Sequence, residues 1–93
     1  MSRRIHKSWL VFLSLENDTH DFCVDVFERP DTSCGFESFR RDVEDSGQWT
    51  PLGYFSASSY RTRRDALIAA TTAVPWLREA AENAPSARAL LAS

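Results

Sequence analysis

The stretch Phe22-Cys23-Val24-Asp25-Val26-Phe27-Glu28-Arg29 decides the fold. Its apolar residues alternate between two faces, with Phe22, Val24 and Val26 on one and Cys23 and Phe27 on the other, and a period of two is typical of a β-strand. Residues 30–35 contain a proline that fixes φ and a glycine that tolerates positive φ, so they predict a turn. We therefore expect the stretch to form one arm of an antiparallel hairpin.

Three further strands are expected beside this one. Residues 8–15 are short, aromatic and apolar, which indicates a buried strand, and a polar turn at 16–21 joins it to the first stretch. Residues 36–41 are predicted to form the other arm of the hairpin, and the serine-rich segment 54–60 to form an edge strand. Residues 42–53, which are acidic at their start, are expected to form a loop between these two.

A helix is predicted at 63–74. Thr62, with Asp65 three residues later, resembles a capping box, and apolar residues recur at helical spacing from Ala66 to Val74. Pro75 lacks the N–H that would bond to the preceding turn, so it should end or kink this helix. Residues 76–82 are expected to add a turn or two.

These elements predict an α+β fold, in which an antiparallel β-sheet of three to four strands is followed by one main C-terminal helix (β-β-β-β-α). The chain has 93 residues, enough for one domain, and its six Phe, three Trp and two Tyr can supply the core. We expect the domain to span 8–82, with a basic N-terminal tail at 1–7 and a flexible C-terminal tail at 83–93.

Composition narrows the possible functions. A net charge of −2 argues against a general nucleic-acid binder or a protein of acidic membranes. The apolar run at 9–13 is too short for a signal peptide or a membrane span, so a cytoplasmic location without membrane contact is expected. Arginine supplies ten of the eleven basic residues and alanine is abundant, which hints at a GC-rich bacterial genome.

No complete catalytic or metal-binding constellation is visible. The four possible zinc ligands match no known ligand spacing: His6, His20, Cys23 and Cys34. Nothing places a nucleophile next to a base, and a disulfide between the two cysteines is improbable because one lies within a strand and the other in a turn. We therefore predict no catalytic residue, no metal and no cofactor.

The arginines at the start of the predicted helix are the sharpest feature. Arg61, Arg63 and Arg64 place positive charge where it opposes the helix dipole, and Asp65 offsets only part of it. Guanidinium groups and free backbone N–H groups at such a position can bind an anion. The plainer interpretation is that they pair with the acidic loop, which carries Asp42, Glu44 and Asp45. A nucleic-acid binder would also use Arg40 and Arg41.

The same helix carries a family resemblance. The run Arg63-Arg64-Asp65-Ala66, followed by Ala69, Ala70 and Ala73, resembles the last helix of double-stranded-RNA-binding domains over about fifteen residues. The resemblance implies a preceding three-stranded sheet and contacts between phosphates and the basic residues of the first helical turn. Leu67 stands where that family usually has a lysine, and there is no room for the family's first helix before Ser8.

The strands carry more apolar residues than one helix can cover. Strict alternation points Leu10, Phe12, Cys23 and Phe27 away from the predicted helix, and large apolar patches are rarely left exposed. Either the segment 76–81 folds back over this second face, or a second copy or another protein covers it. The predicted interface residues are Leu10, Phe12, Phe27 and Trp76.

The expected function is accordingly that of a small non-catalytic interaction module that self-associates through its sheet, as a homodimer or with a protein partner. The first alternative is a nucleic-acid or phosphate binder that uses the arginines. The second is a small enzyme or an enzyme accessory subunit, for which the sequence offers no particular residues.

Overall fold

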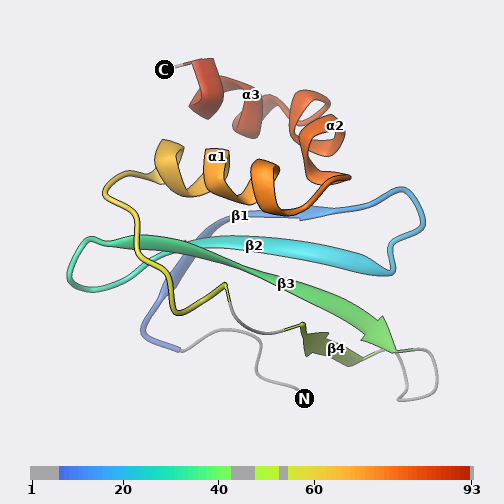
Figure 1. The fold of residues 1–93 in the computed structure, drawn as a ribbon, viewed down its shortest axis with the longest axis horizontal. Coiled ribbons are helices and arrows are strands. Elements are labelled where there is room, and N and C mark those ends of the chain that lie inside the picture. Colours follow the sequence, from blue (N-terminus) through green and yellow to red (C-terminus); the bar gives the residue numbers. More distant parts are fainter. Residues whose placement is uncertain (1–6, 43–47, 53–54, 93) are drawn as a thin grey trace.

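The computed structural model describes residues 7–42, 48–52 and 55–92. It consists of a four-stranded antiparallel sheet followed by three helices, which confirms the α+β fold (Figure 1). Neighbours in the chain are neighbours in the sheet, whose order is β1-β2-β3-β4. The elements are β1 (Leu10–Glu16), β2 (Phe22–Glu28), β3 (Cys34–Asp42), β4 (Gln48–Pro51), α1 (Arg63–Ala73), α2 (Leu77–Glu82) and α3 (Pro85–Ala92).

The hairpin of β2 and β3 forms as expected, but the positive φ in its turn belongs to a threonine and not to the glycine. Thr32 takes the positive φ, at 73°, whereas Gly35 lies within β3 opposite Phe27. A Cβ atom on Gly35 would lie 3.0 Å from the Phe27 ring, so the glycine is needed for close approach and not for the turn.

The fourth strand lies earlier in the chain than predicted. β4 pairs with the end of β3 within the segment expected to be a loop, and Pro51 is tolerated because it ends an edge strand. Within the expected strand 54–60, Tyr60 makes a single bridge to Cys34. Residues 43–47 of the acidic loop and Tyr54 lie outside the described residues, as do residues 1–6 of the expected N-terminal tail.

Helix α1 confirms the prediction for 63–74. The backbone N–H of Asp65 donates to Thr62 Oγ1 at 3.0 Å, which caps the helix, and the last helical residue is Ala73. Val74 follows with an extended backbone just before Pro75, as the missing N–H of proline requires.

The C-terminal segment 83–93, predicted to be a flexible tail, instead forms α3 at 85–92. Pro85 occupies the first position of this helix, where a backbone N–H is not needed. Ala87 is fully buried, and Leu90 and Leu91 pack against the core. The domain therefore extends at least to Ala92.

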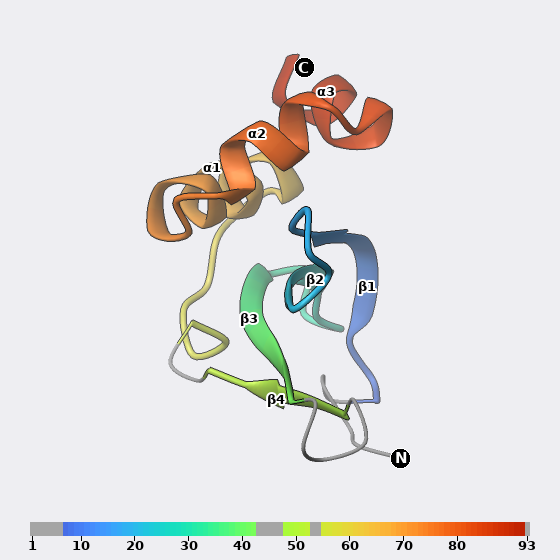
Figure 2. The same cartoon turned by 90° about the vertical axis from the view of Figure 1, so that its right-hand side faces the viewer.

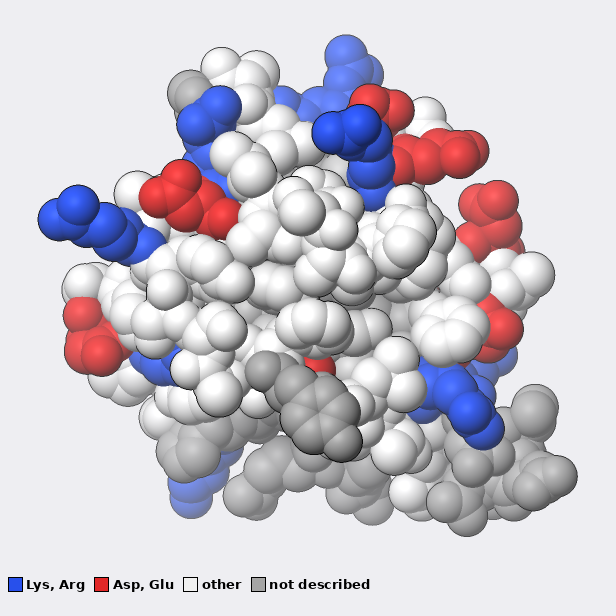
Figure 3. Space-filling model, viewed as in Figure 1, with Lys and Arg blue, Asp and Glu red and all other residues white. Residues whose placement is uncertain are grey.

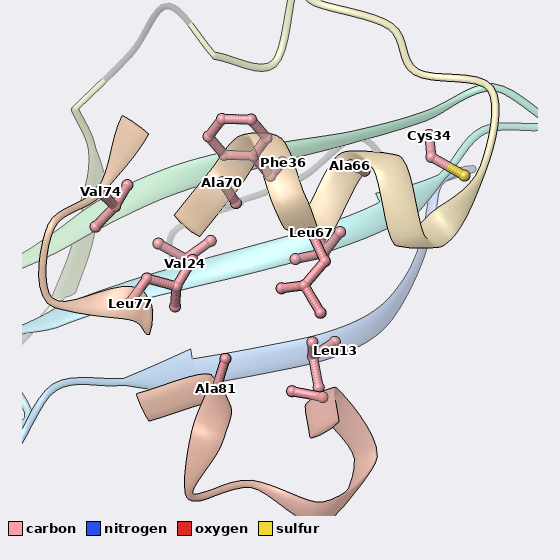
Figure 4. Packing of buried hydrophobic residues seen from close by; sticks show 12 residues of the cluster. Leu13, Val24, Cys34, Phe36, Ala66, Leu67, Ala70, Val74, Leu77 and Ala81 are labelled. Atoms are coloured by element: carbon pink, nitrogen blue, oxygen red, sulfur yellow. The ribbon is translucent and has the colours of Figure 1, made fainter. Parts of the chain in front are cut away.

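All three helices lie on one side of the sheet, and β4 lies at the end of the molecule farthest from them (Figure 2). The core between sheet and helices is made by small and branched residues together with Phe36, and α1 packs on β2 and β3 (Figure 4). Its main members are Leu13, Val24, Val26, Phe36, Ala66, Leu67, Ala70, Leu77, Ala81 and Ala87.

Because β1 contains a β-bulge, its side chains do not all point to the predicted faces of the sheet. The register shifts between Val11 and Leu13, so Leu10 pairs with Glu28 and Phe12 joins the core under the helices. Strict alternation would have turned Phe12 the other way, and one extra residue in a strand reverses that order.

The second face of the sheet is covered within the chain, but not by residues 76–81. Cys23, Phe27 and Phe39 on this face are at most 2% exposed. Trp9 stacks on Phe27 with ring centroids 4.8 Å apart, whereas Leu77 and Ala81 pack on the helix side. Of the residues in the predicted apolar surplus, Cys23 and Phe27 are therefore core, whereas Leu10 stays exposed.

Candidate functional site

The arginines at the start of α1 make contacts within the chain. Arg63 Nε donates to Glu28 Oε1 at 2.9 Å, and its guanidinium lies 4.6 Å from the centroid of the Phe12 ring. Arg64 Nε donates to the carbonyl oxygen of Leu91, 3.2 Å away in α3. The two side chains thus extend towards different elements, and the partner of Arg63 comes from β2 and not from the acidic loop.

The five arginines of the predicted anion site form two separate groups. The bridge between Tyr60 and Cys34 places Arg61 beside the start of β3. Arg40 and Arg41 lie near the other end of that strand, about 20 Å away at roughly 3.3 Å per residue. In Figure 3, charges of both signs lie around the rim of the face shown, whose middle is largely uncharged. Glu44 and Asp45 lie outside the described residues.

The four predicted interface residues do not share one surface. Leu10 is 60% exposed and Phe12 half-buried, and both lie on the helix side of β1. Phe27 is fully buried under Trp9. Trp76 lies near Phe22, at the other end of β2 from Phe27. Only Leu10 and Phe12 are brought together.

A row of polar side chains crosses the second face of the sheet. Ser14, Asp25 and Glu37 are successive register partners on β1, β2 and β3, and the two carboxylates are only 1% and 3% exposed. Asp25 Oδ1 accepts hydrogen bonds from Ser14 Oγ at 2.6 Å and from Cys23 Sγ at 3.4 Å. We call Ser14, Asp25 and Glu37 the polar row. The sequence shows that Asp25 is the one acidic residue within an apolar run, but its neighbours on the adjacent strands follow only from the strand register.

Glu37 connects the polar row to the segment after β4. Its Oε2 accepts from the backbone N–H of Ser38 at 2.9 Å, and its Oε1 from that of Ser56 at 3.1 Å. Hydrogen bonds to both oxygens offset part of the cost of burying the charge. The row contains a hydroxyl and two carboxylates but no histidine or lysine to activate the hydroxyl. We therefore read it as structural.

Arg29 also contacts the segment after β4. Its guanidinium lies 4.6 Å from the Trp9 ring centroid and 5.0 Å from that of Phe27. It also donates to the carbonyl oxygens of Ser56 and Ser58 at 2.5 and 3.1 Å. The sequence alone did not single out Arg29, because the residues next to it in the chain do not indicate contacts with residues about thirty positions away.

The two cysteines are buried thiols. Burial, assisted by the nearby carboxylate of Glu28, raises the pKa of the Cys34 thiol above its ordinary value. A thiol with a raised pKa is a poor nucleophile and a poor metal ligand at neutral pH. Over the described part of the chain, no three His, Cys, Asp or Glu side chains gather in a way that could hold a metal ion.

Two apolar hollows open on the helix side of the sheet. The first, which we call the β1–α3 groove, is lined by Phe12, Leu13, Arg63, Ser86, Ala89 and Leu90. The second, which we call the Trp76 pocket, has a volume of about 280 Å³. It lies where α1 ends, and its lining residues are Phe22, Ser38, Leu52, Phe55, Ala73, Val74, Pro75 and Trp76.

No protein-family model matches the chain, and no curated protein or solved structure shows significant similarity to it. Among the helices of the described residues, none has the length and apolar character needed to cross a membrane.

Proposed function

We propose that the chain is a small, non-catalytic interaction module that self-associates through the β1 edge of its sheet. The observation that carries the proposal is Leu10, whose side chain is 60% exposed on the same side of β1 as Phe12, which lines the β1–α3 groove. An exposed leucine next to an open apolar groove is self-complementary. In a twofold dimer, each Leu10 enters the groove of the other copy.

The charges along the β1 edge favour the same arrangement. Lys7 precedes the strand and Glu16 ends it, both are exposed, and the residues between them are mostly apolar. Antiparallel pairing of two β1 edges places the basic start of one strand beside the acidic end of the other. Opposite charges across a strand pair contribute about 0.2–1 kcal/mol, so they set the orientation more than the affinity.

The edge, and not the face, of the sheet is the surface that remains for association. Phe27 and Phe39 on the second face are fully buried within one chain. β1 is an edge strand of the described sheet, and its bulge limits regular pairing, as bulges do at many protein edges. We therefore expect a weak, reversible dimer in which side-chain insertion matters more than a long hydrogen-bonded ladder.

Analytical ultracentrifugation of the whole chain at micromolar concentrations tests the proposal. The parent should show a concentration-dependent dimer, and Leu10→Asp should remain monomeric, because the new charge would be buried in the groove. Leu52→Asp is the matched control, since Leu52 is also exposed, at 44%, but follows β4 at the opposite edge of the sheet. A strictly monomeric parent, or equal effects of the two variants, would refute self-association through β1.

A further inference from the structure

The Trp76 pocket contains one buried polar group among apolar walls. Ser38 is only 3% exposed and lines the pocket from β3. Its backbone is satisfied, because its N–H donates to Glu37 and its carbonyl oxygen accepts from the backbone of Leu52 at 2.8 Å. Its hydroxyl makes no hydrogen bond to any of the residues that the structure describes. The hydroxyl is therefore available to pair with a ligand in the pocket.

The walls of the pocket are held in place by the core. Phe55 stacks on Phe36 with ring centroids 5.0 Å apart, and Val74 caps the end of α1 through its N–H bond to Ala70 at 2.9 Å. Pro75 and Trp76 follow in the turn that leads to α2. The pocket is therefore formed by rigid aromatic and aliphatic groups, as ligand sites usually are.

The size of the pocket restricts the ligand. Its volume of about 280 Å³ is slightly below the range of about 300–1,000 Å³ that holds drug-sized molecules. An apolar cavity of about 150 Å³ already accepts a benzene-sized molecule. A space of this size holds a small molecule or one side chain, whereas a stable protein interface buries about 800 Å² on each side.

The charges around the pocket restrict the ligand further. Arg40 lies two residues beyond Ser38 on the same side of β3, which puts a positive charge about 7 Å along the strand. On the other side, α1 ends with no basic residue in its last turn, so its carbonyl groups present the negative end of the helix dipole. The two effects oppose each other, and neither an anion nor a cation gains from both.

We propose that the Trp76 pocket binds a small, uncharged and mostly apolar molecule with one hydrogen-bonding group, which pairs with the Ser38 hydroxyl. The rings of Phe22, Phe55 and Trp76 surround its apolar part. This site is independent of the β1 edge, since the two share no residue.

Four probes of similar shape test the proposal: benzyl alcohol, toluene, benzoate and benzylammonium. Binding is measured by NMR on the ¹⁵N-labelled chain. The proposal expects shifts at Leu52, Phe55 and Trp76, with benzyl alcohol tighter than either charged probe. Ser38→Ala should weaken benzyl alcohol roughly fivefold, the value of one neutral hydrogen bond, and leave toluene unchanged or tighter. The variant removes a group without a described partner, so the fold should persist.

A variant in which the pocket is filled shows whether the probes bind in this pocket or elsewhere on the surface. Ala73 is exposed and lines the pocket, so Ala73→Trp should fill it without removing a core contact and abolish the binding of all four probes. Ala89→Trp, which fills the β1–α3 groove instead, is the matched control and should leave binding intact. Tighter binding of a charged probe, equal losses for alcohol and toluene in Ser38→Ala, or binding that survives Ala73→Trp would each overturn the proposal.

Discussion

Asp25 and Glu37 lie directly opposite each other on β2 and β3, and their carboxylates are 1% and 3% exposed. Two buried carboxylates on neighbouring positions of one sheet face repel each other, and burial strengthens the repulsion. The fold tolerates them because each accepts hydrogen bonds, Asp25 from side chains and Glu37 from backbone N–H groups. This difference in partners predicts a difference in how the two residues respond to substitution.

Glu37→Gln should lower the free energy of unfolding by about 1–3 kcal/mol, because its amide nitrogen would face one of the two backbone N–H donors. Asp25→Asn should change it by less than about 1 kcal/mol, since the side chain keeps an oxygen for Ser14 and one of the neighbouring charges is removed. Urea denaturation of both variants measures which substitution lowers the free energy of unfolding more. A larger loss for Asp25→Asn would show that the charge of Asp25 itself is required.

Arg29→Lys should lower the free energy of unfolding by about 2–4 kcal/mol, although it keeps the charge. The guanidinium fork donates to several groups at once and stacks on Trp9, and an ammonium can reproduce neither arrangement. Arg40→Lys serves as the control, because Arg40 is exposed, and should cost less than about 0.5 kcal/mol. Similar losses in the two variants would contradict a clamping role. The atoms that accept from Arg29 are Ser33 Oγ, Cys34 O, Ser56 O, Ser58 O and Ser59 Oγ.

Helix α3 should be part of the cooperative fold. Ala87 is fully buried, so Ala87→Gln would force a polar side chain into the core and should lower the stability by about 2–4 kcal/mol. Ala89 lies on the exposed side of the same helix, and Ala89→Gln should change the stability by less than about 0.5 kcal/mol. Thermal unfolding followed by circular dichroism compares the two. If both variants melt like the parent, α3 does not contribute to the stable core.

The sequence was a good guide wherever structure depended on local pattern. The alternation at 22–28 and the Thr62 cap predicted β2 and α1 to within about a residue, because strand period and capping are properties of neighbouring positions. It failed where the outcome depended on distant contacts. Nothing near Phe12 signals a bulge, and Pro85 can stop one helix or start another.

The candidate site shows the same difference between features that depend on local sequence and features that depend on distant contacts. The arginine cluster was visible in the sequence, but which carboxylate Arg63 reaches depends on how α1 lies against β2. The polar row depends on the register of three strands, and the Trp76 pocket on the meeting of five separate segments. Such groupings follow from tertiary packing, which the pattern of a single segment cannot specify.

Stability should fall as the pH rises through the range in which free thiols ionise, and Cys34 should account for part of the fall. Burial raises the pKa of Cys34 in the folded chain, so the unfolded chain releases this proton first, near about pH 8.5. Its contribution is therefore complete below that pH and is lost above it. Urea midpoints measured between pH 7 and pH 10 should fall less steeply in Cys34→Ala than in the parent. Identical slopes would show that Cys34 does not contribute.

The last prediction concerns the arginines at the start of α1. An anion bound there would stabilise the folded chain by mass action, so the Tm would rise with its concentration. Because Arg63 already pairs with Glu28 and Arg64 with the Leu91 carbonyl, we expect no such specific effect. Melts in sulfate, phosphate and chloride at matched ionic strength compare the parent with Arg63→Ala/Arg64→Ala. Sulfate strengthens apolar burial in any protein, so parent and variant should gain equally. A gain that disappears in the variant would instead establish an anion site and revive a role in binding phosphate or nucleic acid, which salt-dependent RNA binding would then test.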